Sequence, residues 1–252
     1  MHFLLSFNRS TLVSLCSWTL ILAGCFCYFL ASIGFRAQYG RYENKTKLAV
    51  PARFAWIVQE ILSLIFPLWF CLEAETGIGR VATFLVGVHY VNRCLIFPLY
   101  GRFSQNQPLF YFACAFILCS LSGYAQGAAH VGRFTTAKLT DPFSLFALAI
   151  FLLGATINIH SDYLLRNLRK PGEIEHKIPR GGMFEYVSGA NFFGEIVEWF
   201  GYFLFTRTLA GFALFFFSAS NLGPRAFHHH KDYLKKFPNY PKNRRALIPY
   251  LI

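Results

Sequence analysis

Three rows of polar side chains recur at helical spacing inside otherwise apolar stretches of the sequence. They are Asn158, Asp162 and Arg169; Asn191, Glu195 and Glu198; and Arg225, His229 and Tyr233. Residues separated by four, seven, eight or eleven positions lie on one face of a helix, so each row predicts a polar stripe. Such stripes favour a cavity lined by donors, acceptors and cations that holds a large anionic ligand. The alternative is a polar network that only joins helices.

Ionisable residues also lie singly inside apolar segments. Glu60 is one, and His89, Tyr90 and Arg93 form a second group, in which Tyr90 and Arg93 are three apart and share a helical face. An ionisable side chain in hydrocarbon costs at least ~2.5 kcal/mol, so it normally faces the interior of a bundle and marks a site or a pathway. For each residue taken alone, a purely structural hydrogen bond is the competing interpretation.

The elements that position these residues must be membrane helices. Of the 252 residues, 55% are hydrophobic and only 14% are charged, against roughly 25% charged in soluble domains. Seven apolar runs approach the ~20 residues that cross a bilayer. They cover residues 11–33, 54–73, 81–100, 109–130, 142–163, 190–206 and 208–223. The sequence predicts an all-α, polytopic membrane protein with seven transmembrane helices and a single domain over 1–252. The last two runs also fit one kinked segment followed by a re-entrant piece.

The distribution of basic residues predicts the orientation. Nineteen of the 24 Lys and Arg fall in connections on one side, including the tail from Arg225, and five fall on the other. The positive-inside rule therefore predicts a cytosolic C-terminus and a lumenal or external N-terminus. The predicted polar stripes then lie at the cytosolic ends of their helices.

Composition excludes several other classes. The formal net charge of +12 is compatible with anionic lipid or a phosphate-rich ligand, but the hydropathy argues against nucleic acid. The seven cysteines lack paired spacing, so neither a disulfide framework nor a zinc site is expected. Adjacent residues His228 to His230 point roughly 100° apart on a helix, which argues against a metal cluster. We expect no metal.

Several segments resemble the steroid 5-alpha-reductase family, and most closely the animal type 1 and type 2 enzymes. The matching segments are Asn158–Tyr163, Arg169–Glu173, Ile178–Gly182, Tyr186–Asn191, Gly194–Trp199, Arg225–His230 with Tyr233, Ala246–Pro249, Pro51–Arg53 with Trp56, Gln59–Glu60, and His89–Tyr90. The resemblance covers almost everything beyond the first apolar run.

The resemblance implies a multi-pass enzyme of the endoplasmic reticulum membrane that reduces the C4–C5 double bond of 3-oxo-4-ene steroids with NADPH. Hydride delivered to carbon 5 leaves negative charge on the 3-oxygen, which a donor in a water-poor cavity stabilises. By the resemblance, Tyr90 is that donor and Glu60 assists it. We expect membrane lipids and the steroid as partners, and a monomer.

The family positions around NADPH coincide with the polar stripes. They match Asn158, Asp162, Arg169, Asn191, Glu195, Arg225, His229 and Tyr233. The loop 164–189 and the tail 224–252 are thereby expected to contribute to the cofactor site. Trp56 and Trp199 lie one helical turn from Glu60 and Glu195 and are candidates to wall the steroid, although packing or interfacial anchoring explains a tryptophan equally well.

Two segments depart from the family pattern. Ser122-Gly123 stands where relatives carry Asn-Gly, and the loop 101–108 lacks an Arg and a Pro found in relatives. These departures leave open which groups hold the outer phosphates and which steroid is preferred. Two other functions also stay open: an NADPH-dependent reductase of another enone or enoyl lipid on the same scaffold, and a proton-coupled transporter using Glu60, Asp162 and Glu195.

Overall fold

The computed structural model describes residues 8–40, 42, 46–101, 103, 105–132, 139–169, 173 and 177–252. Its main elements are seven long helices, as the apolar runs predict. They are α1 (Arg9–Ser32), α2 (Ala52–Glu73), α3 (Gly77–Val91) continued by a π-helical turn η2 (Asn92–Ile96) and α4 (Phe97–Tyr100), α5 (Leu109–Ala128), α6 (Pro142–Asn167), α7 (Ala190–Thr206) and α8 (Leu209–Lys236).

Five of the helices described are long and apolar enough to cross a membrane: α1, α2, the continuous α3 to α4, α5 and α6. The remaining two, α7 and α8, are separated by Arg207 in the left-handed conformation and by the N-cap Thr208, whose hydroxyl accepts a hydrogen bond from the Gly211 amide. The alternative of one kinked segment is therefore wrong. Helix α8 continues beyond the apolar run that ends at residue 223, through Pro224 and the row Arg225, His229 and Tyr233, whose helical spacing predicts this continuation.

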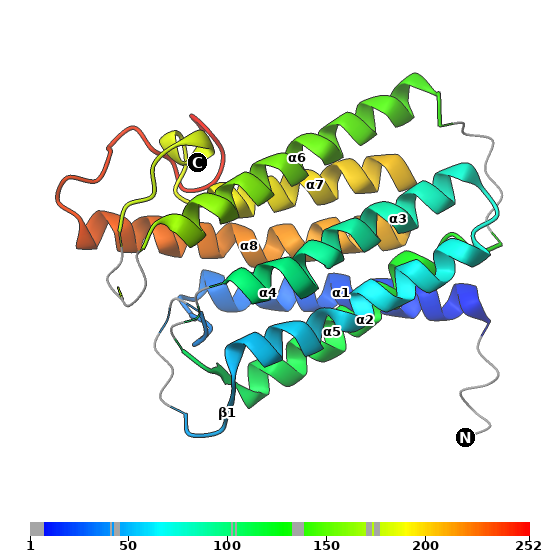
Figure 1. The fold of residues 1–252 in the computed structure, drawn as a ribbon, viewed down its shortest axis with the longest axis horizontal. Coiled ribbons are helices and arrows are strands. Elements are labelled where there is room, and N and C mark those ends of the chain that lie inside the picture. The colour runs from blue at the N-terminus through cyan, green and yellow to red at the C-terminus, as the bar shows by residue number, and fades with distance from the viewer. Residues whose placement is uncertain are drawn as a thin grey trace.

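Six helices form a closed ring, and the seventh lies against it. Around the ring the neighbours are α7, α8, α1, α5, α2 and α3, and α3 returns to α7. Helix α6 packs along α7 through the most extensive helix contact of the molecule (Figure 1). Helices α3 and α6 both lie against α7 but make little contact with each other over the described residues.

Glycines permit the close approach of α6 and α7. A Cβ atom added to Gly154 would lie 2.2 Å from the backbone nitrogen of Glu198, and one added to Gly194 would lie 2.4 Å from that of Asn158. Gly201 meets Phe151 in the same way, at 2.3 Å. Small residues at a helix interface let two backbones touch, which is how membrane helices commonly associate. This contact brings the polar stripes of α6 and α7 face to face.

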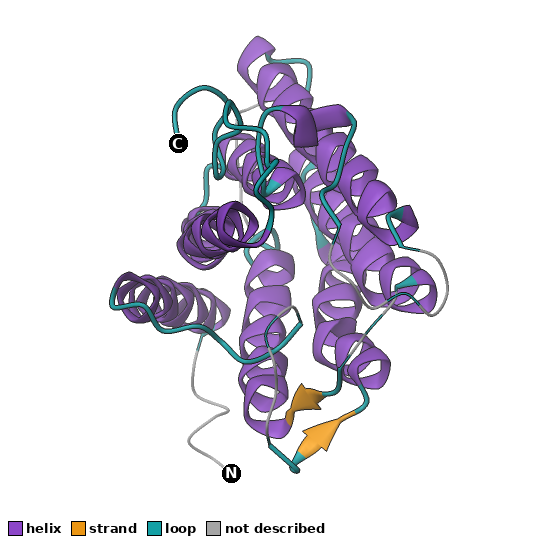
Figure 2. Cartoon of the chain, turned by 90° about the vertical axis from the view of Figure 1, so that its left-hand side faces the viewer, coloured by secondary structure: helices purple, strands orange, loops and turns teal. Residues whose placement is uncertain are grey.

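A small sheet and the C-terminal segment close one end of the bundle (Figure 2). Strands β1 (Ala49–Val50) and β2 (Gln107–Pro108) pair antiparallel, an element that hydropathy does not predict. The C-terminal segment pairs with the loop before α7: the Ser188 amide donates to Arg245 O at 2.9 Å, and the Arg245 amide donates to Tyr186 O at 2.9 Å. A 3₁₀ turn, η3 (Gly182–Glu185), precedes this junction.

Candidate active and cofactor-binding site

The stripes of α6 and α7 meet in a hydrogen-bonded row. Asn158 Nδ2 donates to the backbone oxygen of Asn191 at 2.9 Å, and Asn191 Nδ2 donates to Asp162 Oδ1 at 3.2 Å. Asn158 is buried, with 1% of its surface exposed. The prediction that these side chains converge is confirmed by the contacts between them.

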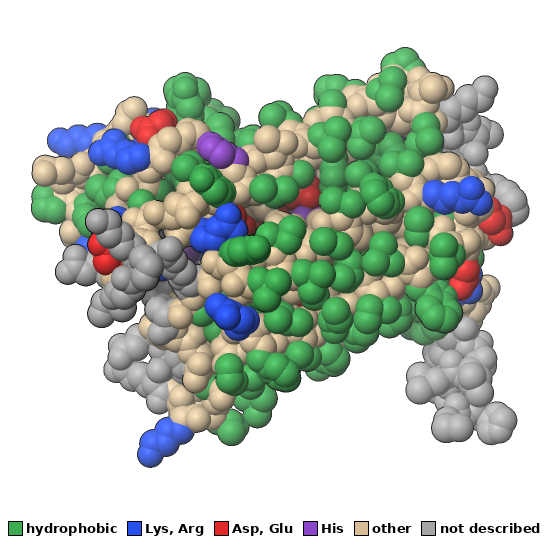
Figure 3. Space-filling model, in the orientation of Figure 1, with side chains coloured by type: hydrophobic (Ala, Val, Ile, Leu, Met, Phe, Trp, Pro, Cys, Tyr) green, Lys and Arg blue, Asp and Glu red, His purple; other side chains and the backbone are tan. Residues whose placement is uncertain are grey.

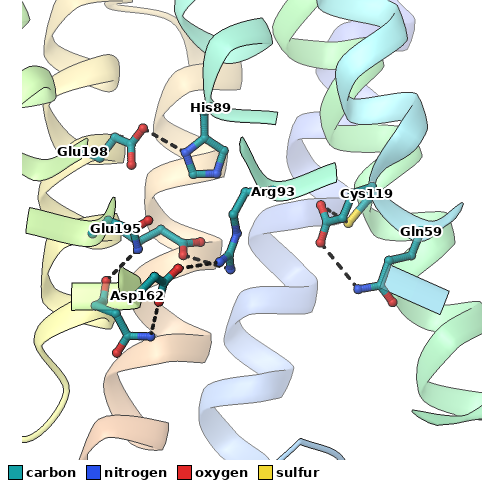
Figure 4. Close-up of polar contacts among 10 residues, drawn as sticks. Gln59, His89, Arg93, Cys119, Asp162, Glu195 and Glu198 are labelled. Atoms are coloured by element: carbon teal, nitrogen blue, oxygen red, sulfur yellow. Dashed lines mark hydrogen bonds and ion pairs between the residues drawn. The ribbon is translucent and has the colours of Figure 1, made fainter. Parts of the chain in front are cut away.

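Arg93 joins this row from the opposite side. Its guanidinium lies 3.3 Å from Asp162 Oδ2 through Nη1 and 3.2 Å from Glu195 Oε2 through Nη2 (Figure 4). The cation also lies over the rings of Trp56, at 5.5 Å, and Phe97, at 5.0 Å. Two carboxylates and two aromatic faces therefore hold a single buried charge, as a fixed planar guanidinium allows.

Sequence reasoning did not place Arg93 in the site, although it noted that Arg93 and Tyr90 share a face. Arg93 belongs to η2, and a π-helical turn inside an α-helix often marks a functional position. Its ion-pair partners are 69 and 102 positions away in the sequence, so local spacing carries no sign of them. The only sign of this cluster in the sequence is that Arg93, Asp162 and Glu195 are ionisable residues in three different apolar runs.

One helical turn before Arg93, on α3, His89 forms a second buried pair with Glu198 of α7. His89 Nδ1 lies 2.8 Å from Glu198 Oε1, and the two side chains are 4% and 2% exposed. Trp199 packs on this pair, with its ring centroid 4.4 Å from that of His89 and 6.3 Å from that of Tyr90. Trp199 therefore packs in the core beside Tyr90. This agrees with the alternative interpretation of Trp199 as a packing residue and not as a wall of the steroid site.

Glu60 lies on the other side of Arg93, in a separate cluster with Gln59 and Cys119 (Figure 4). Gln59 Nε2 lies 3.5 Å from Glu60 Oε1, and Cys119 Sγ lies 3.5 Å from Glu60 Oε2. Gln107 of β2 donates to Gln59 Oε1 at 2.9 Å, so the small sheet reaches this cluster. Tyr90 is 7% exposed, and its hydroxyl neighbours Glu60 and Ser63.

A cavity of about 1240 Å³ lies among α3, η2, α6, α7 and α8. Eight of the twelve predicted site residues line it: Trp56, Asn158, Asp162, Arg169, Asn191, Arg225, His229 and Tyr233. The other four, Glu60, Tyr90, Glu195 and Trp199, are not part of its wall. The structure thus separates the predicted catalytic pair from the predicted cofactor-binding residues, with Arg93 between the two groups.

The stripe of α8 forms part of the cavity wall with the segment after α1. The Arg225 guanidinium donates to the Tyr39 hydroxyl and lies 4.5 Å from the centre of the Tyr39 ring. The His229 ring lies 5.4 Å from that of Phe192, and Tyr233 stacks on Tyr240 at 5.2 Å. Of the predicted loop 164–189, residues 170–172 and 174–176 lie outside the described residues, as do 102 and 104 of the departing loop 101–108.

The segments that hold the C-terminal tail contain two titratable groups with shifted pKa values. The Gly181 amide donates to Glu185 Oε1 at 2.6 Å and lowers the pKa of this carboxyl, and Arg244 adds to the effect from the other oxygen. Burial lowers the pKa of His230, and the charge of Arg245 acts in the same direction. His230 Nδ1 lies 2.6 Å from Ser188 Oγ, which also contacts the Tyr240 hydroxyl at 2.6 Å.

The cavity offers a donor set that suits a dinucleotide phosphate. Three arginines, Arg166, Arg169 and Arg225, lie on its wall beside amide and carboxylate groups. The buried Nε atoms of Arg225 and Trp56 have no hydrogen-bond partner among the described residues, so both can donate to a ligand. Guanidinium groups bind phosphate, and side-chain amides can form hydrogen bonds with ribose and carboxamide groups. These observations fit NADPH.

Comparison with known proteins gives a consistent result. A family model described as 3-oxo-5-alpha-steroid 4-dehydrogenase matches residues 105–252. The chain is 44% identical over 239 residues to the type 1 3-oxo-5-alpha-steroid 4-dehydrogenase of Mus musculus, covering 90% of this chain and 93% of the mouse protein. It is 41% identical over 244 residues to the type 2 protein of Homo sapiens, covering 93% and 94%.

Proposed function

We propose that this chain, which belongs to the 3-oxo-5-alpha-steroid 4-dehydrogenase family, reduces the C4–C5 double bond of 3-oxo-4-ene steroids with NADPH. The observation that supports this most directly is the convergence of polar residues from α6, α7 and α8 on one cavity inside an apolar bundle. NADPH, when bound, supplies the hydride. The side chains of this protein bind the cofactor, hold the steroid and stabilise the charge that develops.

In this proposal the eight predicted cofactor residues hold NADPH. Arg169 and Arg225 bind phosphate, and Asn158, Asp162, Asn191 and Glu195 orient the remaining polar groups. His229 and Tyr233 complete the wall at the end where the C-terminal tail packs. Loop 164–189 and tail 224–252 thereby contribute to a single domain over 1–252.

Tyr90 and Glu60 polarise the 3-oxo group of the steroid. Charge that appears on this oxygen is stabilised best by fixed donors in a site that excludes water. The Tyr90 hydroxyl is buried next to Glu60 and Ser63, and Glu60 lies in an apolar helix with few competing donors. Trp56 lines the cavity and its ring contacts Arg93, and in this proposal it walls the steroid.

We further propose the endoplasmic reticulum membrane as the location, with the C-terminus in the cytosol and the N-terminus in the lumen. The unequal distribution of Lys and Arg supports this orientation. Protease protection of tags placed at each terminus in sealed microsomes tests it. A C-terminal tag that resists protease in sealed vesicles would contradict the orientation.

The activity is tested with purified protein, NADPH and either testosterone or progesterone. We expect loss of NADPH absorbance together with formation of the 5α-saturated 3-ketone. Tyr90→Phe should reduce kcat by ~10² to 10³, because it removes the donor to the oxyanion. Glu60→Gln should also reduce kcat, because it replaces the carboxyl group that assists Tyr90, while the Kd for NADPH stays unchanged in both variants. Tyr100→Phe is the matched control, since Tyr100 lies on the same continuous helix and is 64% exposed.

A panel of substrates separates the remaining alternatives. If enones or enoyl lipids are turned over and 3-oxo-4-ene steroids are not, the scaffold carries a different reductase. If no such compound supports NADPH oxidation by folded protein, the proposed reduction is wrong. Proton-coupled transport would then be measured in proteoliposomes.

A further inference from the structure

The C-terminal segment contains a tyrosine that contacts the cavity wall without belonging to it. This segment lies beyond the broad apolar band of the surface, at an end of the molecule where charged side chains gather (Figure 3). Tyr240 is buried and does not line the cavity. Its ring stacks on that of Tyr233, with the centroids 5.2 Å apart and the planes 8° apart, and its hydroxyl lies 2.6 Å from Ser188 Oγ. Tyr233 of α8 and Ser188, which precedes α7, both line the cavity.

The local backbone determines where Tyr240 lies. Its amide donates to Phe237 O at 3.0 Å and closes a turn in which Pro238 takes the second position, which suits the fixed φ of proline. Pro241 follows and restricts the backbone of Tyr240 in turn. The Arg244 guanidinium lies over the Tyr240 ring, 5.5 Å from its centre. The position of this ring therefore does not depend on a ligand.

Ser188 links Tyr240 to His230 of α8 through two hydrogen bonds. Its Oγ lies 2.6 Å from the Tyr240 hydroxyl and 2.6 Å from His230 Nδ1. A serine hydroxyl carries one proton, so it donates to one of these partners and accepts from the other. Burial lowers the pKa of His230 and favours the neutral ring, whose Nδ1 can accept. When Nδ1 accepts, Tyr240 donates to Ser188 and Ser188 donates to His230.

We propose that Tyr240 is a positioning residue for the cofactor: its hydroxyl fixes Ser188, its ring fixes Tyr233, and both wall residues are thereby held in the arrangement that binds NADPH. The inference rests on the proposed function, because it takes NADPH as the ligand of the cavity. Ser188 precedes α7, whose first turn carries Asn191, so a displaced Ser188 also disturbs a proposed cofactor contact. Side chains that are ordered before binding lose less conformational entropy when the ligand arrives, which increases the affinity.

The test is a titration of the purified full-length protein with NADPH, followed by steady-state kinetics. Tyr240→Phe keeps the stacked ring and removes the hydroxyl, so we expect the Kd for NADPH to rise about fivefold, as the loss of one hydrogen bond implies. The KM for NADPH should rise in parallel, whereas kcat at saturating NADPH and the KM for the steroid should not change. A general loss of stability would not produce this split. Tyr250→Phe is the matched control, because Tyr250 belongs to the same segment, is 76% exposed and lies outside the cavity wall.

A double-mutant cycle tests whether Tyr240 acts through Ser188. Ser188→Ala should also raise the Kd for NADPH, and adding Tyr240→Phe to it should have little further effect, because the hydrogen bond is already absent. Tyr240→Leu removes the stacked ring as well and should raise the Kd more than Tyr240→Phe does. If Tyr240→Leu does not fold, the cycle between Tyr240→Phe and Ser188→Ala still decides the question.

The outcomes separate this inference from the proposed function. An unchanged Kd in Tyr240→Phe, or an equal rise in the presence and absence of the Ser188 hydroxyl, would overturn the positioning role while leaving the proposed reduction intact. NADPH binding that depends on Tyr240 in a protein that reduces no 3-oxo-4-ene steroid would support the positioning role and contradict the proposed reduction. Failure of the unmodified, folded protein to bind NADPH would overturn both.

Discussion

The contact between α6 and α7 gives a prediction about cofactor binding, because it aligns both polar stripes through a backbone approach that only glycine permits. In Gly154→Ala the new methyl carbon would start 2.2 Å from Glu198 N, 2.6 Å from Glu198 Cα and 2.7 Å from Gly194 O. All three are backbone atoms, so no side-chain rotation relieves the overlap. Carbon contacts settle near 3.5 to 4.0 Å, and the two helices must therefore separate by roughly 1 Å.

Such a separation stretches the 2.9 Å hydrogen bond from Asn158 Nδ2 to Asn191 O beyond hydrogen-bonding distance. Overpacking of a close contact costs about 1–3 kcal/mol of folding free energy. Loss of an aligned hydrogen bond within the proposed cofactor site costs about 1 kcal/mol more. We expect a clearly lower Tm and a Kd for NADPH raised about fivefold to tenfold.

Thermal unfolding and NADPH titration of the purified variant measure both effects. Gly223→Ala is the control: it lies inside α8, and its added Cβ would meet only Leu247 Cδ2, at an ordinary 3.8 Å. We expect this variant to stay close to the parent in stability, because the better helix propensity of alanine is offset by the restriction that Pro224 places on the residue before it. A Gly154→Ala protein as stable as the parent, with unchanged affinity for NADPH, would refute the view that close backbone packing aligns the stripes.

Two further predictions concern buried charge and pH. Arg93→Gln leaves the carboxylates of Asp162 and Glu195 near each other without their cation, so we expect a loss of about 3–5 kcal/mol of stability. The control Arg166→Gln, at a half-buried site outside this ion pair, should cost little stability. Equal Tm values for the two variants would contradict this reasoning. Folding lowers the pKa of His230, so its contribution to stability is complete above the unfolded pKa of about 6.5 and decreases as the pH falls through the folded value. The protection factors of the amides at residues 186–189, which are exchange rates corrected for the intrinsic pH dependence of exchange, should therefore fall between pH 7 and 5. His230→Gln should flatten this dependence, and a slope that persists in the variant would assign it to another group.

The parts of this molecule that local spacing determines could be predicted, and the parts that depend on distant contacts could not. Apolar runs of about 20 residues give the seven helices, since the hydrocarbon core imposes that length. Residues at positions i, i+4 and i+7 form the polar stripes, because the period of a helix does not depend on which other helix packs against it. By contrast, the partners of Arg93 come from α6 and α7, and the pairing of His89 with Glu198 joins residues 109 positions apart. No local pattern distinguishes these residues from helix-joining polar groups.

The predicted catalytic pair illustrates the same limit. Spacing puts Glu60 and Tyr90 inside their helices, and both lie within the bundle. Their separation from the large cavity depends on where the Arg93 side chain extends, which is set by the carboxylates of Asp162 and Glu195. The apolar run 208–223 covers only the first part of α8, because a hydropathy window stops at polar residues, whereas the helical spacing of Arg225, His229 and Tyr233 predicts that the helix continues.

The pairing of the C-terminal segment with residues 186–189 has a consequence for biosynthesis. Arg245 and Ala246 supply the carbonyl oxygens that accept from the Ser188 and Gly189 amides, yet the ribosome adds these residues more than fifty positions later. Helices α1 to α7 precede this segment in the chain and can form before it is made. The proposed nucleotide pocket therefore stays incomplete until translation has passed residue 246, and a chain that ends upstream of residue 245 lacks the acceptors of the Ser188 and Gly189 amides.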